Sequence, residues 1–559
     1  MIDRTDYDEK LVVGFDLMSR LARLVVGTAR LVEGTASHEK ALHSALTGGS
    51  FSAVDTAASY GAGSSERLVG KVLSSLSDAR RRDIELMSKF GFYVEHSGNG
   101  NDVIGADPSA AAKVRHAMSP FFMRSELDAS LRRLGTSRLD AFLVDSPERA
   151  LQPLIDQRNK ALIDAASASA LANTAEVLPS NHLESAAAAV AAAEAALQSG
   201  RDEMLSQLTS TFIALEEEVA AGRVGCYGVS SDALALEADD PLRLPWRDVL
   251  RAAETAAREV GSPPSAFRIL QLPTNVLEPG GGKVAREVLS FNMQRLSFNV
   301  QPQRRLRVMG TRPLTTVMPL QRRDAEGRST EDSDGGLGPG STTWQRLVDF
   351  APATVYLPGD KEGLALEPVV VDPLAPAPGG YMSACQDALA HFSFELPTDR
   401  SPSEEETELY EACRWLQQLL GDMNQQLVHF VSVAHYEQEL SGQIMPMLND
   451  KFEELDAHSA AVLQHFLAHY HGMVRYHAAE QIRKQVQAAL RQSDSRPPEE
   501  AMATSEGGEV NENKCDSLYG LTLGWALERP GISDVVVGIT QESHADDARE
   551  LLASRRETL

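Results

Sequence analysis

The 559-residue chain lacks any apolar run near the ~18 residues that a membrane-spanning helix requires, so no membrane span is expected. It is also short of positive charge: 53 Lys and Arg against 79 Asp and Glu give a net charge of −26. This balance argues against nucleic acid or an anionic membrane as the main partner. The four cysteines form no CxxC pair, which indicates reduced thiols of an intracellular protein.

The first twenty residues carry acidic side chains, including Asp3 and Glu9, among the basic Arg4 and Lys10. Transit peptides are poor in acids, so this segment fits one poorly. We therefore expect a cytoplasmic protein. A mitochondrial location stays open, because a presequence could already have been removed.

Short apolar runs alternate with helical periodicity, which is typical of βα units. The predicted strands are 24–28, 51–55, 84–89, 139–144, 224–229, 267–272, 306–309 and 534–537. The predicted helices between and after them are 38–46, 64–76, 124–134, 204–221, 246–260, 284–293, 518–527 and 545–552. This order predicts an α/β fold, a (β/α)8 TIM barrel.

Two segments interrupt the barrel pattern. The first is rich in alanine, the best helix former, and predicts a helical hairpin; the second is helical between edges rich in Gly, Ser, Pro and acids. Each follows a strand, so each could cover the site mouth or dock a partner. The predicted organisation is 20–149 first half of the barrel, 150–203 Ala-rich helical insertion, 204–319 barrel continued, 320–379 flexible loop, 380–492 inserted helical subdomain, 493–514 disordered linker and 515–559 barrel completion. A further loop, rich in Gly, Asn and Asp, is predicted at 93–118.

Ionisable residues stand where three successive strands end. Asp55 ends the second strand with Tyr60 five residues later, Lys89 ends the third, and Asp145 follows the fourth. Because the carboxyl ends of parallel barrel strands form the active-site rim, these four side chains are the candidate site. A Tyr beside a Lys and an Asp is suited to protonating a carbonyl.

The motifs around these residues resemble those of the aldo-keto reductase family. The resemblance rests on VDTAASYG at 54–61 with Glu66, SKFG at 88–91, GVSS at 228–231, QLPTN at 271–275 and VVVG at 535–538. It covers about half of the chain and leaves both insertions without a counterpart.

The resemblance implies hydride transfer from a nicotinamide cofactor to an aldehyde, ketone or sugar-type carbonyl, with Tyr60 as the proton donor. Lys89 would lower the pKa of Tyr60 toward neutrality, and Asp55 would hold Lys89 in place. Asp145 stands where the family usually has His, a neutral donor to the carbonyl. An ionised carboxylate accepts but does not donate, whereas a protonated Asp145 could donate.

The resemblance also implies the cofactor residues Ser230, Ser231, Gln271, Arg312, Gly538 and Thr540. Arg312 could instead pair with an acid at the rim. The run 538–548 has no Lys or Arg to grip the 2′-phosphate of NADP(H), so NAD or the absence of a cofactor stays open beside NADP(H).

His465 and His469 are i,i+4 neighbours, but no Glu lies between them in the HExxH manner, so we predict no metal site. Two functions follow. One is an NAD(P)-dependent reductase of small carbonyl substrates. The other is a pseudoenzyme, a scaffold or cofactor-sensing subunit whose helical insertion binds protein partners.

Overall fold

The computed structural model describes residues 21–95, 113–174, 181–296, 305–319, 345–349, 353–355, 369–371, 381–397, 399–427, 436, 440, 444–451, 457–493 and 518–558. The chain divides into two compact units. One comprises 1–313, 321–344 and 523–559, and the other comprises 314–320 and 345–522.

The first unit is a closed barrel of eight parallel strands, in the order β1-β14-β9-β8-β7-β6-β3-β2. The strands are β1 (Arg23–Gly27), β2 (Ala53–Asp55), β3 (Glu85–Phe90), β6 (Leu139–Asp145), β7 (Val224–Ser230), β8 (Phe267–Pro273), β9 (Arg307–Thr311) and β14 (Ile532–Gly538). All eight predicted strands are confirmed, including the last, which pairs with β1 from the far end of the chain. The predicted (β/α)8 barrel is therefore correct.

Apolar side chains from seven of the eight strands fill the barrel interior. The shared cluster is fully or almost fully buried and consists of Val25, Ala53, Met87, Ala141, Leu143, Ile269, Met309 and Val536. Such a layer makes the barrel a packed core and leaves the polar strand ends as the place for chemistry.

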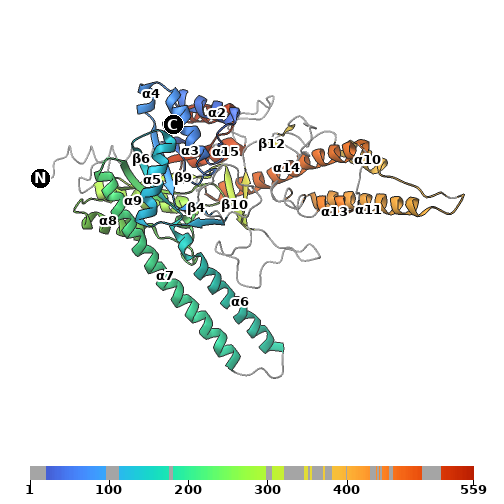
Figure 1. Ribbon diagram of the computed structural model, residues 1–559, viewed down its shortest axis with the longest axis horizontal. Coiled ribbons are helices and arrows are strands. Elements are labelled where there is room, and N and C mark those ends of the chain that lie inside the picture. The colour runs from blue at the N-terminus through green and yellow to red at the C-terminus, as the bar shows by residue number, and fades with distance from the viewer. Residues whose placement is uncertain are drawn as a thin grey trace. The chain divides into compact units, whose positions relative to one another are not determined.

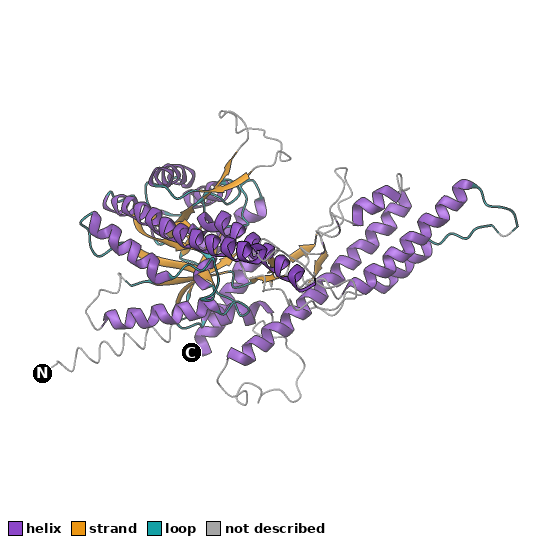
Figure 2. Ribbon diagram, turned by 90° about the horizontal axis from the view of Figure 1, so that it is seen from below, coloured by secondary structure: helices purple, strands orange, loops and turns teal. Residues whose placement is uncertain are grey.

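Helices surround the strands, as Figure 2 shows. They are α2 (Ala36–Thr47), α3 (Ser64–Ser75), α4 (Asp78–Arg82), α5 (Pro120–Leu134), α7 (Asn181–Ala220), α8 (Trp246–Glu259), α9 (Gly280–Leu296), α15 (Leu518–Leu527) and α16 (Glu542–Thr558). Helix α5 ends at Gly135 in the left-handed conformation (φ 63°), the C-cap that its sequence predicts.

The first insertion forms a hairpin of α6 (Gln152–Thr174) and α7, which run side by side away from the barrel (Figure 1). The predicted start of a separate barrel helix at 204 is wrong, because α7 is one helix of 40 residues. Its Ala-rich first half has high helix propensity and no proline interrupts it. The barrel helix therefore continues straight into the insertion.

The predicted loop at 93–118 is also wrong at its ends. Strands β4 (Phe92–Glu95) and β5 (Lys113–His116) pair as an antiparallel hairpin directly after β3. Phe92 and His116 face each other across it, with ring centroids 5.3 Å apart. A cross-strand aromatic pair stabilises such a hairpin.

The second unit contains helices α10 (Tyr381–His391), α11 (Glu404–Gln426), α13 (Met445–Lys451) and α14 (Ala457–Ser493). Its core includes Phe392, Leu416, Tyr436, Phe466 and Tyr470. It also holds the short strands β10 (Thr315–Pro319), β11 (Gln345–Asp349), β12 (Ala353–Val355) and β13 (Val369–Val371), which pair as β10–β11 and β12–β13.

These strands correct the predicted flexible loop 320–379 at 345–349, 353–355 and 369–371, where β-branched residues favour strand. The rest of that loop and the predicted linker 493–514, apart from Ser493, lie outside the described residues. The proposed domain boundaries stay a prediction.

Four charged residues close the barrel at the amino ends of its strands. Arg23 pairs with Glu85 at 2.6 Å and with Asp534 at 2.7 Å, and Arg307 pairs with the same acids at 2.7 and 3.0 Å. Burial alone would raise the pKa of Glu85, but Arg307 and Arg23 outweigh it and hold that pKa below its usual range. Among the described residues, no helix is both long and apolar enough to cross a membrane.

Candidate active site

The ends of β2 and β3 bring Asp55, Tyr60 and Lys89 into direct contact. Lys89 Nζ lies 2.7 Å from Asp55 Oδ2 and 2.9 Å from the Tyr60 hydroxyl. It also donates to the backbone oxygen of Thr56 at 3.1 Å. An ammonium has three N–H donors, so Lys89 is fully committed within this cluster.

Neighbouring strands and a short turn position the cluster. In β2, Asp55 pairs in register with Met87 of β3, two residues before Lys89. After β2 the chain turns back, with Tyr60 N bonded to Ala57 O, and Gly61 follows at φ 55°. That left-handed residue suits glycine and returns the Tyr60 side chain to the strand ends.

The pKa of Tyr60 does not fall toward neutrality as expected; it rises to about 12. Burial is the main cause, and Lys89 opposes it without prevailing, because the carboxylates of Asp55 and Asp145 also raise this pKa. The pKa of Lys89 is likewise above its usual value: burial would lower it, but Asp55, Tyr60 and Asp145 together outweigh burial. At neutral pH the pair is therefore a neutral phenol beside an ammonium, and the phenol can donate its proton.

Asp145 ends β6, half-buried, in register with Ser230 of β7. Ser146 Oγ donates to its Oδ1 at 3.2 Å. Burial raises the pKa of Asp145 to about 6, since Lys89 and Ser146 favour the carboxylate too weakly to offset it. The residue can thus change charge near physiological pH.

Two neighbours of Asp145 belong to no motif that would have marked them in the sequence. His116, on the β4–β5 hairpin, bonds the Asp145 backbone oxygen at 2.7 Å through Nε2. Glu148, in the 3-10 turn η1 (Pro147–Leu151), is buried and accepts from Ser231 Oγ at 2.7 Å. Burial raises the pKa of Glu148 to about 7.

Two residues predicted to hold a cofactor carboxamide already have partners beside this cluster. Gln271 Nε2 donates to Asp55 Oδ1 at 2.9 Å, and Ser231 Oγ donates to Glu148 while accepting from Ala233 N at 3.0 Å. Ser230 ends β7 next to both. Hydroxyl, amide and carboxyl groups thus gather at the ends of β6, β7 and β8.

The other predicted cofactor residues lie in acidic surroundings. Arg312 follows β9 and forms ion pairs with Glu278 at 2.8 Å and with Asp232 at 3.3 Å. Gly538 ends β14, and Thr540 N is bonded to His544 Nδ1 at 3.3 Å. Helix α16 then begins with Glu542 in its first turn, and no Lys or Arg stands between Gly538 and Ala548.

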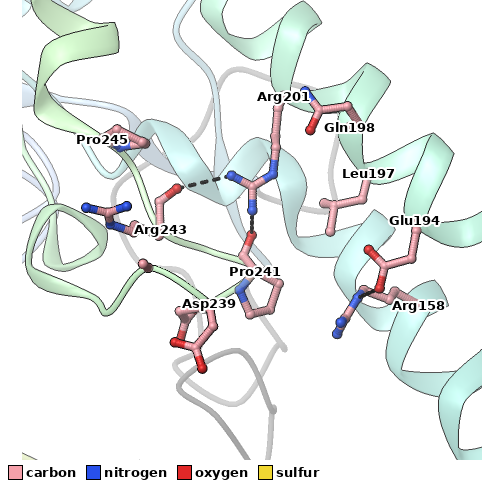
Figure 3. Close-up of a pocket in the computed structure, with 11 residues that line it drawn as sticks. Arg158, Glu194, Leu197, Gln198, Arg201, Asp239, Pro241, Arg243 and Pro245 are labelled. Atoms are coloured by element: carbon pink, nitrogen blue, oxygen red, sulfur yellow. Dashed lines mark hydrogen bonds and ion pairs between the residues drawn. The ribbon is translucent and has the colours of Figure 1, made fainter.

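A separate polar pocket of about 280 Å³ lies between the α6–α7 hairpin and residues 238–245 (Figure 3). Arg201 of α7 donates to the backbone oxygens of Pro241 and Arg243, and Arg158 of α6 pairs with Glu194. None of the strand-end residues lines this pocket. Its contacts anchor the hairpin to the barrel loop that follows η2 (Asp232–Ala235).

The predicted absence of a metal site stays a prediction. His465 and His469 lie with ring centroids 4.6 Å apart on α14. In the described part of the chain, however, no three His, Cys, Asp or Glu side chains are grouped as metal ligands would be.

The closed parallel barrel and the Asp–Tyr–Lys cluster at its carboxyl rim together define a (β/α)8 barrel of the aldo-keto reductase type. Residues 23–237 match the model of the Aldo/keto reductase family. Members of this family are typically NAD(P)H-dependent oxidoreductases.

Solved structures of similar proteins are distant in sequence. Glycerol dehydrogenase from Gluconobacter oxydans is 17% identical with a TM-score of 0.29, over 52% of this chain and 59% of that one. An aldo-keto reductase from Bacillus halodurans in its holo form is 17% identical with a TM-score of 0.30, over 52% and 62%.

A thermostable aldo-keto reductase in complex with the inhibitor epalrestat is 17% identical with a TM-score of 0.27, over 52% of this chain and 68% of that one. The chain thus spans about three fifths of the first two relatives. No curated protein sequence matches the chain.

Proposed function

We propose that the chain is an oxidoreductase that interconverts a small carbonyl compound and its alcohol, with Tyr60 as proton donor in the reducing direction. The observation that carries this proposal is the 2.9 Å contact between Lys89 Nζ and the Tyr60 hydroxyl. The ammonium occupies a lone pair of the phenol oxygen, so the phenol proton points elsewhere and is free for a substrate. As the substrate oxygen gains negative charge, the ammonium stabilises the phenolate left behind.

The residues present fit one end of a nicotinamide cofactor better than the other. Ser230, Ser231 and Gln271 offer hydroxyl and amide groups suited to a carboxamide, and a bound cofactor would supply or accept the hydride there. The match of residues 23–237 to the aldo/keto reductase model favours NADP(H). At the phosphate end, however, Glu542 begins α16 and Arg549 is paired with Asp546, so a 2′-phosphate finds little positive charge. We therefore propose that NAD(H) competes with NADP(H) for this site.

The alternative is a barrel without turnover that serves as a scaffold or cofactor-sensing subunit, with the helical insertion as the surface for protein partners. The ion pairs of Arg312 with Glu278 and Asp232 favour it, because an arginine held by two acids is poorly available to a pyrophosphate. A cytoplasmic location is part of either proposal, with a mitochondrial one left open.

Cofactor binding separates the two functions. The full chain is titrated with NADPH, NADP+, NADH and NAD+ by fluorescence, and NADPH oxidation is then followed with a broad panel of aldehydes, ketones and sugars. Binding with turnover supports the enzyme, binding without turnover supports the sensor, and no binding rules out the enzyme and the sensor and leaves the scaffold. Asp145→His adds a direct comparison: a latent enzyme gains rate from the neutral donor, whereas a scaffold without cofactor does not respond.

A further inference from the structure

The loop that carries Tyr60 has a backbone conformation that L residues rarely adopt. Gly61, Ala62 and Gly63 follow one another at φ 55°, 50° and 80°. A left-handed Ala costs conformational energy, and it persists only where surrounding contacts hold it. The loop is therefore held by residues outside it, and those residues also fix the position of the phenol.

Three buried hydroxyl groups supply such contacts. Thr28, Thr56 and Ser65 are fully buried. Ser65 Oγ lies 2.7 Å from Thr28 Oγ1 and 3.1 Å from Thr56 Oγ1. Thr28 Oγ1 in turn donates to the backbone oxygen of Asp55 at 3.1 Å. Each hydrogen is used once when Thr56 donates to Ser65 and Ser65 donates to Thr28. These hydroxyls thus connect the start of α3 to the ends of β1 and β2.

We propose that Ser65 and Thr56 are positioning residues of this site, and that their hydroxyl contact holds Lys89 at the distance from the Tyr60 hydroxyl that proton donation requires. The inference rests on the proposed function. It adds two residues that act on the reaction through Lys89 and Tyr60.

Thr56 is the link to Lys89. Its N–H donates to the backbone oxygen of Met87 at 3.0 Å, and its hydroxyl contacts Ser65. Its backbone oxygen accepts from Lys89 Nζ at 3.1 Å and is one of three acceptors around the ammonium. A shift of Thr56 therefore moves Lys89 relative to the Tyr60 hydroxyl.

Ser65 is the link to Tyr60. Its backbone N–H donates to the backbone oxygen of Tyr60 at 3.3 Å, across the left-handed residues 61–63. The next residue of α3, Glu66, accepts from Ser88 Oγ at 2.6 Å, and Ser88 directly precedes Lys89. The first turn of α3 thus contacts the chain on both sides of the Lys89–Tyr60 pair, and it sets their separation.

Ser64 supplies a matched control. It lies in the same turn of α3 and is also buried, but its Oγ accepts from the backbone N–H of Glu33, which is not part of the cluster. Misplacing a reacting group by about 1 Å can cost about 10²-fold in rate. In carbonyl reduction by the full chain, we expect Ser65→Ala to lower kcat by about tenfold or more and to change KM by less than about twofold. Ser64→Ala should keep kcat within about twofold of the wild-type value.

Thr56 tests the same contact by isosteric exchange. Thr56→Val keeps the shape and removes the hydroxyl, so kcat should fall as in Ser65→Ala. Thr56→Ser keeps the hydroxyl and should retain most of the wild-type kcat. Because the two hydroxyls act through one contact, Ser65→Ala combined with Thr56→Val should lower kcat no further than Ser65→Ala alone.

Thermal unfolding of each variant separates positioning from folding. Equal kcat in Ser64→Ala and Ser65→Ala, or a kcat that follows the loss of stability across all the variants, overturns the inference and leaves the proposed function standing. A wild-type chain without turnover overturns the proposed function itself. If circular dichroism shows that Ser65→Ala does not fold, Thr56→Val and Thr56→Ser carry the test, and equal kcat in those two overturns the inference.

Discussion

Replacing Lys89 with Met leaves the Asp55 carboxylate buried without its counter-ion. Both side chains are almost inaccessible, 1% and 4% exposed, and lie 2.7 Å apart. At that separation the attraction is about 6 kcal/mol for an effective dielectric near 20, before the cost of desolvation is subtracted. Removing one partner of such a buried pair costs about 3–5 kcal/mol of folding free energy.

The control is the exposed pair of Lys71 and Glu39, 2.6 Å apart with side chains 56% and 39% exposed. There Lys71→Met should cost no more than about 1 kcal/mol, because water screens the charges. The double variant Lys89→Met with Asp55→Asn should regain much of the lost stability, since no buried charge is left.

Hydrogen exchange of peptides covering residues 51–60 and 84–91 measures the change within the barrel unit. A Lys89→Met chain as stable as the Lys71→Met chain, or a double variant less stable than Lys89→Met alone, would refute this account of the cluster.

Three further predictions concern other parts of the fold. Glu85→Gln should make the free energy of unfolding depend less on pH in the acid range. The depressed pKa of Glu85 adds stability that is present above about pH 4.5 and is lost as the pH falls through the pKa of the folded state. Acid titration followed by circular dichroism measures this dependence. Gly70→Ala should destabilise the barrel by about 1–3 kcal/mol, because a Cβ would lie 2.7 Å from the Arg133 backbone oxygen. Gly421→Ala in α11 has open space around it and should raise the free energy of unfolding by about 0.5–1 kcal/mol. Thermal unfolding measures both changes. Arg201→Ala should increase hydrogen exchange at 236–245, since two backbone oxygens lose their donor, and unchanged exchange would show that the hairpin is anchored elsewhere.

Much of the barrel was predictable from local patterns. Short apolar runs between helical segments mark every strand, and β14 is recognised by its Val535–Val537 run although about 220 residues separate it from β9. The order of the strands around the barrel follows because consecutive βα units usually lie side by side. The merging of α7 with the first insertion was missed because alanine-rich sequence carries no boundary, and only a capping residue or proline would have marked one.

The contact among Asp55, Tyr60 and Lys89 was predictable from the sequence, whereas the pKa values of these groups were not. Asp55, Tyr60 and Lys89 could be grouped because each stands at or shortly after the end of a strand. The raised pKa of Tyr60 depends on burial by residues far apart in sequence, which no local pattern encodes. Glu148 escaped notice for a similar reason: it follows a proline in a short turn, and only the folded chain brings it to Ser231.

The most direct test of the central claim compares wild type with Tyr60→Phe in NADPH oxidation by a carbonyl substrate found in the panel. The variant keeps the ring and loses only the hydroxyl that Lys89 contacts. We predict that cofactor affinity is retained while kcat falls by about 10²-fold or more, the usual contribution of a general acid. An unchanged kcat would contradict the assignment of Tyr60 as proton donor.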